Sequence, residues 1–187
     1  MNGPDNKIGW CDFTANPVSG RCQHACSYCY AEAIRKRYKQ PVEIKFKPNW
    51  FDGRQVDKFI RENDRFPIIF VGSMHDLFGE WIPSAQIQDV INLCAKKDAC
   101  RFVFLTKNPK RYQEFEQFKY LDNCILGTTV TCHEDEWRIV KLLKAKCRCR
   151  MLSIEPMLGD LGKLNLEGID WVVIGCESGP NRRPCKI

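Results

Sequence analysis

From about residue 66 onward, short apolar segments alternate with longer amphipathic ones, and this pattern constrains the fold more than any other feature. The apolar segments are rich in β-branched and aromatic residues, which favour strands, whereas the longer segments have helical spacing. We expect strands over residues 68–73, 101–106, 125–130, 150–154 and 171–175, and helices over residues 30–38, 85–96, 109–118 and 134–144. The alternation predicts an α/β protein with a parallel sheet, either doubly wound or closed as a barrel.

Polar side chains follow every one of the expected strands. Both α/β architectures bind ligands at the carboxyl ends of their strands, so we expect these side chains to share one mouth. In chain order they are Ser73, His75 and Asp76, then Thr106 and Lys107, then Thr129, Thr131 and Cys132, then Ser153 and Glu155, then Cys176, Glu177 and Ser178.

The chain has the size and balance of one globular domain, spanning residues 1–187, with 44% hydrophobic and 28% charged residues. Residues 39–63 form the least regular stretch of the sequence and are expected to be an inserted excursion rather than a domain boundary. No apolar run approaches the roughly 20 residues of a membrane-spanning helix, and the N-terminus lacks the pattern of a signal peptide. We therefore expect a cytoplasmic protein with no membrane partner.

Three cysteines, Cys22, Cys26 and Cys29, lie within eight residues, with the spacing C-x3-C-x2-C. In a reducing cytoplasm such a cluster more often binds metal than forms disulfides. Iron–sulfur clusters usually have four thiolate ligands, so three would leave one iron open to another ligand. The alternative is a structural zinc site completed by His24 or another cysteine.

The cysteine spacing, with the aromatic Tyr28 directly before the last cysteine, resembles the signature of the radical S-adenosylmethionine (SAM) superfamily. Longer motifs extend the resemblance over most of the chain to the uncharacterised phage-associated three-cysteine-motif family. These motifs are NPVSG at residues 16–20, CYAE at 29–32, GSMHDLF at 72–78, LSIEPMLG at 152–159 and IDWVVIGCESGP at 169–180. Two positions depart from the family pattern: Ala15 stands where tryptophan is usual, and Cys176 where glycine is frequent.

The resemblance implies a partial (β/α)6 barrel that carries a 4Fe-4S cluster on Cys22, Cys26 and Cys29, in the loop after the first strand. Family members continue beyond residue 187, so we expect a barrel truncated after its last strand and open on that side. SAM would lie across the strand ends. The implied SAM-binding residues are Tyr28 beside the adenine, Gly72, Ser73, Met74 and Asp76 near the amino group, and Thr129 and Thr131 near the ribose or methionine part.

The implied function is that of a radical SAM enzyme. The reduced cluster would cleave SAM to a 5′-deoxyadenosyl radical, which abstracts hydrogen from the substrate. A reductant protein of the flavodoxin or ferredoxin type would supply the electron. Glu155 and Glu177 are the carboxylates expected near the substrate as catalytic residues; alternatively, they accept hydrogen bonds from backbone N–H groups or from Arg182 and Arg183.

A formal charge of +6 is concentrated in basic runs at residues 35–39, 107–111, 141–150 and 182–183. Such runs either contact phosphates, which suggests a nucleotide or nucleic-acid substrate, or cover solvated helix faces. The rival function is therefore a basic nucleic-acid-binding module stabilised by an iron–sulfur cluster or zinc, without catalysis. A second cluster on Cys11, Cys132, Cys176 and Cys185 is a further alternative, with free thiols the default.

Overall fold

A computed structural model describes residues 1–4, 6–178 and 182–184. Its main sheet contains six strands, all parallel to their neighbours. They are β1 (Phe13–Ala15), β4 (Ile68–Val71), β5 (Arg101–Thr106), β6 (Cys124–Thr129), β7 (Cys149–Ile154) and β8 (Trp171–Ile174). The α/β class and the parallel sheet expected from the sequence are confirmed.

The spatial order of the strands, β1-β4-β5-β6-β7-β8, follows their order along the chain. A doubly wound sheet reverses its strand order at a switch point, and this sheet has no such reversal. Among the described residues, β1 and β8 remain the two edges, so the sheet is open rather than a closed barrel.

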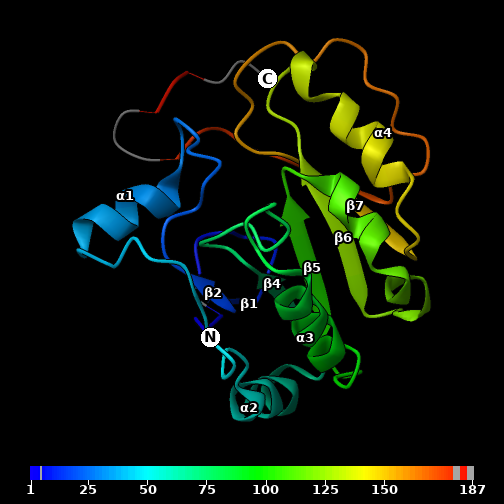
Figure 1. Ribbon diagram of the computed structural model, residues 1–187. Helices are drawn as coiled ribbons and strands as arrows, with labels where there is room; N and C mark the ends of the chain where they lie inside the picture. The colour runs from blue at the N-terminus through cyan, green and yellow to red at the C-terminus, as the bar shows by residue number, and fades with distance from the viewer. Residues whose placement is uncertain (5, 179–181, 185–187) are drawn as a thin grey trace.

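The helices that follow the strands pack on one face of the sheet, as right-handed crossovers between sequential parallel strands require. Figure 1 shows α3 and α4 on this face, with α1 to one side of the sheet. The helices are α1 (Tyr30–Arg37), α2 (Gly53–Asn63), α3 (Ser84–Cys94) and α4 (Trp137–Leu143), and three 3₁₀ segments span Pro109–Glu114, Glu116–Tyr120 and His133–Asp135. A small antiparallel hairpin pairs β2 (Val18–Ser19) with β3 (Lys45–Phe46).

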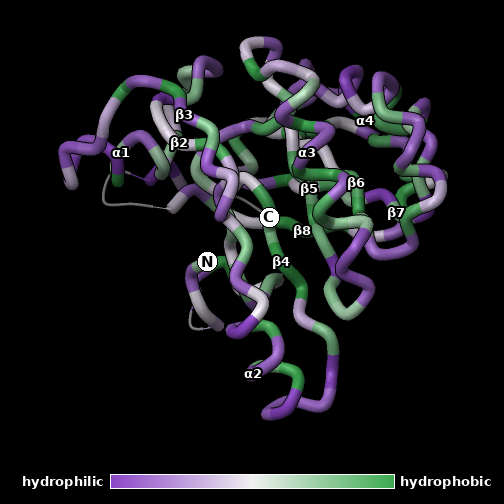
Figure 2. The backbone as a smooth tube through the Cα atoms, turned by 60° about the horizontal axis from the view of Figure 1, so that its bottom comes forward, coloured by the Kyte–Doolittle hydropathy of each residue, from purple (hydrophilic) through white to green (hydrophobic). Residues whose placement is uncertain are grey.

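The core lies between α2, α3 and α4 and alternate residues of the strands, because successive strand side chains point to opposite faces. Phe102, Phe104 and Leu126 belong to the same buried cluster as Ile87 and Val90 of α3. Figure 2 shows the contrast between the largely hydrophobic strands in the centre and the hydrophilic α1 at the margin. None of the helices in the described ranges is long and apolar enough to cross a membrane.

Trp10, which precedes β1, packs on the opposite face of the sheet. Its indole contacts Phe70 of β4, with the ring centroids 5.0 Å apart, and Trp171 of β8, with the centroids 5.8 Å apart. Four strand spacings separate β4 from β8, which is roughly 19 Å in a flat sheet. One indole can contact both rings only because the sheet curls towards this face.

The structure differs in detail from the sequence expectations in three stretches. Residues 39–63, the least regular stretch by sequence, contain β3 and the 11-residue helix α2, which the sequence did not predict. Asp52 caps α2 by accepting a hydrogen bond from the Arg54 N–H, and Val56 and Phe59 are buried. Residues 109–118 form two 3₁₀ segments rather than an α-helix, and the expected helix at 134–144 is shortened to α4.

Candidate functional site

The three clustered cysteines lie in the loop between β2 and α1, beside the carboxyl ends of β1 and β4. All three are half-buried, whereas the residues that directly precede Cys22 and directly follow Cys22 and Cys26 are exposed. Ala25 has a φ of 51°, a left-handed conformation that turns the chain between Cys22 and Cys26. Cys29 is the N-cap of α1, where its sulfur accepts the Glu32 N–H at 3.3 Å.

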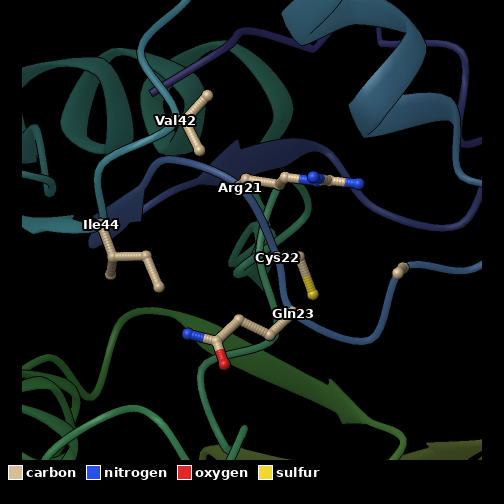
Figure 3. Close-up of a pocket in the computed structure, with 6 residues that line it drawn as sticks. Arg21, Cys22, Gln23, Val42 and Ile44 are labelled. Atoms are coloured by element: carbon tan, nitrogen blue, oxygen red, sulfur yellow. The ribbon is translucent and has the colours of Figure 1, made fainter.

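A cavity of about 480 Å³ lies on the outer side of this loop. Figure 3 shows Cys22 and Gln23 on the loop and Val42 and Ile44 on the segment beside it. Burial raises the pKa of the Cys22 thiol, and hydrogen bonds from backbone groups of Asp76 and His24 oppose that effect. The loop is thus in direct contact with the segment that follows β4.

Asp76 joins the cysteine loop to two strand ends. Its side chain is 8% exposed, and its Oδ2 atom accepts hydrogen bonds from His24 Nε2 at 2.7 Å, from Thr106 Oγ1 at 2.9 Å and from the Lys107 N–H at 2.9 Å. Burial alone would raise the pKa of Asp76, but these donors outweigh it and lower the pKa, so the carboxylate is charged. Asp76 therefore holds the loop to the sheet through protein contacts.

The turn after β4 is fixed from the other side by Asn16, which follows β1. The Asn16 side chain bonds with Ser73 Oγ at 3.2 Å, and its Oδ1 accepts the Met74 N–H at 2.8 Å. Gly72 starts this turn with a φ of 88°. The Tyr30 hydroxyl donates to the Ser73 carbonyl, which ties α1 to the same turn.

Lys107, at the end of β5, points towards the cysteine loop. Its ammonium lies 5.4 Å from the centre of the Tyr28 ring, which suits a cation–π contact. Burial works to lower the pKa of Lys107, but the neighbouring Tyr28, Cys26 and Asp76 outweigh it and raise the pKa. A cation therefore stands beside the cysteine loop.

The two expected carboxylates lie in different surroundings. Glu155, after β7, accepts hydrogen bonds from Trp10 Nε1 at 3.2 Å and Ser153 Oγ at 3.3 Å, so it faces the concave side of the sheet. Glu177 pairs with Arg183, with Oε2 2.6 Å from Nε, and this pairing lowers the pKa of Glu177. The geometry around Glu177 matches the alternative of a structural acceptor for arginine.

The two threonines expected to face SAM also differ. Thr129 ends β6 and is 3% exposed, and its carbonyl accepts a hydrogen bond from Arg138 at 2.9 Å. Thr131 donates its hydroxyl to Asp135 Oδ2 at 2.8 Å and its N–H to the same oxygen at 2.9 Å. Asp135 thereby fixes the segment that follows β6.

The basic runs have mixed roles. Arg111 is buried, pairs with Glu114 at 3.1 Å and donates to the carbonyls of Gly79 and Ile82. Arg35 of α1 pairs with Glu32 at 2.7 Å. These two arginines support the fold locally, whereas Lys107 and Lys110 line a cavity at the carboxyl edge of the sheet.

The donor set of the loop suits an iron–sulfur cluster, since Cys22, Cys26 and Cys29 are free cysteines and thiolates are the usual ligands. His24 donates Nε2 to Asp76, so this imidazole nitrogen is committed to a carboxylate rather than to a metal shared with the thiols. Within residues 1–4, 6–178 and 182–184, no three His, Cys, Asp or Glu side chains are gathered as a metal site. Cys185, one of the four cysteines considered for a second cluster, lies outside the described residues.

Sequence reasoning missed several residues that build this site. Trp10, Asn16 and Tyr30 connect the concave face, the turn after β4 and α1. His24 was considered only as a zinc ligand, whereas in the structure it anchors the cysteine loop to Asp76. Trp10 had no recognisable signal, because it lies in an N-terminal segment outside any strand or helix. Asn16 and Tyr30 did stand within quoted motifs, but their partners lie more than 40 residues away in the chain.

The fold and the site define a parallel α/β protein with a three-cysteine loop at the carboxyl edge of its sheet. The chain belongs to a family of unknown function, described as "Protein of unknown function (DUF5131)", whose model matches residues 5–187. No curated protein and no solved structure matches the chain significantly.

Proposed function

We propose that this protein is a radical SAM enzyme that binds a 4Fe-4S cluster through Cys22, Cys26 and Cys29. The observation that carries the proposal is the position of the C-x3-C-x2-C loop, with three free thiols, at the carboxyl edge of a sequentially ordered parallel sheet. The carboxyl edge is where α/β folds bind ligands.

The sheet supports the finer proposal of a partial (β/α)6 barrel. In a β/α barrel, parallel strands follow one another in sequence order and the helices lie on the outer face, as the strands and helices do here. The contacts of Trp10 with Phe70 and Trp171 give the opposite face its curvature. The concave face then forms the wall of a reaction chamber.

A bound cluster of this type supplies one electron for the reductive cleavage of SAM. The chain's own residues position the reactants. Asp76 and His24 anchor the loop, and Asn16 shapes the turn over Gly72, Ser73 and Met74, where backbone groups would meet the amino group of SAM. The rings of Phe70 and Trp171 give the concave face an apolar surface, and such a surface would limit the access of water to a reactive species.

Glu155 is the carboxylate best placed to contact a substrate. It is half-buried and oriented by Trp10 and Ser153 on the concave face. Glu177 is paired with Arg183, so we propose that it organises the end of the chain beside the site.

The test is anaerobic reconstitution with iron and sulfide, followed by dithionite reduction and measurement of 5′-deoxyadenosine formed from SAM. We expect the wild type to bind about four irons per chain and to cleave SAM. Cys26→Ala should lose both properties. The matched control is Cys149→Ala. Cys149 is also half-buried, but it begins β7 and so lies at the amino-terminal ends of the strands, away from the cysteine loop.

Retention of iron and SAM cleavage by Cys26→Ala would contradict the ligand assignment. A folded wild type that holds stoichiometric zinc, binds nucleic acid and leaves SAM intact would instead support the nucleic-acid-binding module.

A further inference from the structure

A second cavity, of about 430 Å³, lies between the cysteine loop and the loops that follow β4, β5 and β6. We call it the Trp81–Trp137 pocket; its lining includes His24, Trp81, Lys107, Lys110 and Trp137. Its volume falls within the roughly 300–1,000 Å³ of small-molecule sites. Four loops line it, and three of them follow the adjacent parallel strands β4, β5 and β6. The pocket therefore lies at the carboxyl ends of these strands.

The aromatic lining offers flat apolar surface. Trp137 is 46% exposed, and the helix it begins buries Ile139 and Leu142 instead. Trp81 is held in place, because its Nε1 donates to His75 Nε2 at 3.4 Å and its ring meets that of His24 edge-on, with centroids 4.9 Å apart. An exposed indole and a fixed indole in one pocket fit a planar aromatic ligand.

The charged lining favours an anion. Lys107 and Lys110 contribute two ammonium groups, and Glu80 offsets only one of them through its 2.6 Å ion pair with Lys110. The carboxylate of Asp76 is engaged by His24, by Thr106 and by the backbone of Lys107. Lys107 and Lys110 give the lining two cationic groups against the single carboxylate of Glu80, so the lining offers ammonium partners to a ligand that carries phosphate.

We infer that the Trp81–Trp137 pocket binds a nucleotide, with its base against the indoles and its phosphate near Lys107 and Lys110. Stacking of a base on an aromatic side chain and attraction of phosphate by lysine are the two contacts by which proteins hold single nucleotides. Since His24 lies in the cysteine loop and also lines the pocket, a nucleotide here lies beside the proposed cluster. The inference rests on the proposed function and assigns its substrate class.

The experiment is calorimetric titration of the full chain with AMP, adenosine, inorganic phosphate and a short single-stranded oligoadenylate. We expect AMP to bind at least tenfold more tightly than adenosine or phosphate alone. Trp137→Ala should weaken AMP binding roughly tenfold, in line with the loss of one stacking contact. Lys110→Ala should weaken AMP binding and leave adenosine binding unchanged.

Lys110 is exposed, so we expect its replacement by alanine to leave the fold intact. The matched controls are Tyr120→Ala and Lys119→Ala, which remove an exposed aromatic and a partly exposed lysine outside the pocket and should not change AMP binding. If the oligonucleotide binds more tightly than AMP, the ligand of the pocket is a nucleotide within a polynucleotide. If the two bind equally, the ligand is a free nucleotide.

Unchanged AMP affinity in both Trp137→Ala and Lys110→Ala overturns the inference. So does displacement of AMP by SAM in reconstituted protein, because the pocket would then belong to SAM. Nucleotide binding is measured without iron or SAM cleavage, so failure of this inference leaves the proposed function standing. Conversely, if the chain binds AMP but takes up no iron, the proposed radical SAM function fails and the proposed nucleotide pocket stands.

Discussion

Replacement of Gly72 by alanine tests the turn that carries the segment from β4 to Asp76. Gly72 has a φ of +88°, and a Cβ atom there would lie 2.8 Å from the carbonyl oxygen of His75. The left-handed backbone costs an L-residue about 1–2 kcal/mol, and forcing an extra carbon into packed structure costs about 1–3 kcal/mol. We therefore expect Gly72→Ala to lower the free energy of unfolding by about 2–5 kcal/mol.

Gly9 provides a matched control within the same chain. Its φ is +83°, but a Cβ atom there would meet nothing within 4 Å. Gly9→Ala should therefore show the backbone cost alone, about 1–2 kcal/mol. The change in unfolded-state entropy is the same in both variants and cancels in the comparison.

Urea denaturation followed by far-UV circular dichroism measures both free energies. For a chain of this size each kcal/mol lowers the melting temperature by about 2–4 °C, so thermal melts should rank the variants in the same order. Equal losses in Gly72→Ala and Gly9→Ala would refute the reasoning, because they would mean that the carbonyl of His75 does not crowd Gly72.

Three further predictions address the packing around the site. Tyr112→Phe should lower the free energy of unfolding by about 1–2 kcal/mol, because its buried hydroxyl bonds to backbone carbonyls of β5 and β6; an unchanged urea midpoint would contradict this. Trp10→Phe should cost about 1 kcal/mol through the lost hydrogen bond to Glu155, and Trp10→Ala about 1–3 kcal/mol more through lost burial; equal values would show that packing on the concave face contributes nothing. Burial lowers the pKa of His75 from 6.5, so below pH 6.5 the unfolded chain binds a proton that the folded chain does not, and stability should fall as the pH drops. His75→Asn should flatten this dependence in urea titrations between about pH 7.5 and 5.5, and an equally steep loss in the variant would assign it to another group.

The sequence predicted the elements whose signals are local. The limits of β5 agree with the expected strand at both ends, since its β-branched and aromatic run is bounded by turn residues. Helix α2 was missed although Asp52, Val56 and Phe59 form a capped helical pattern, because Pro48 and Gly53 nearby suggested an irregular stretch. The cysteine loop was found from spacing alone.

The sequence by itself determined the α/β class, the parallel sheet and the three-thiol loop, because periodicity and spacing are properties of neighbouring residues. Only the tertiary structure decided the strand order, the curl of the sheet around Trp10, the anchoring of the loop by Asp76 and the convergence of Trp81 and Trp137 on one pocket. Each of these depends on contacts between residues far apart in the chain. Such contacts depend on the order in which the strands pair within the sheet and on which loops then lie side by side, and no local sequence pattern encodes them.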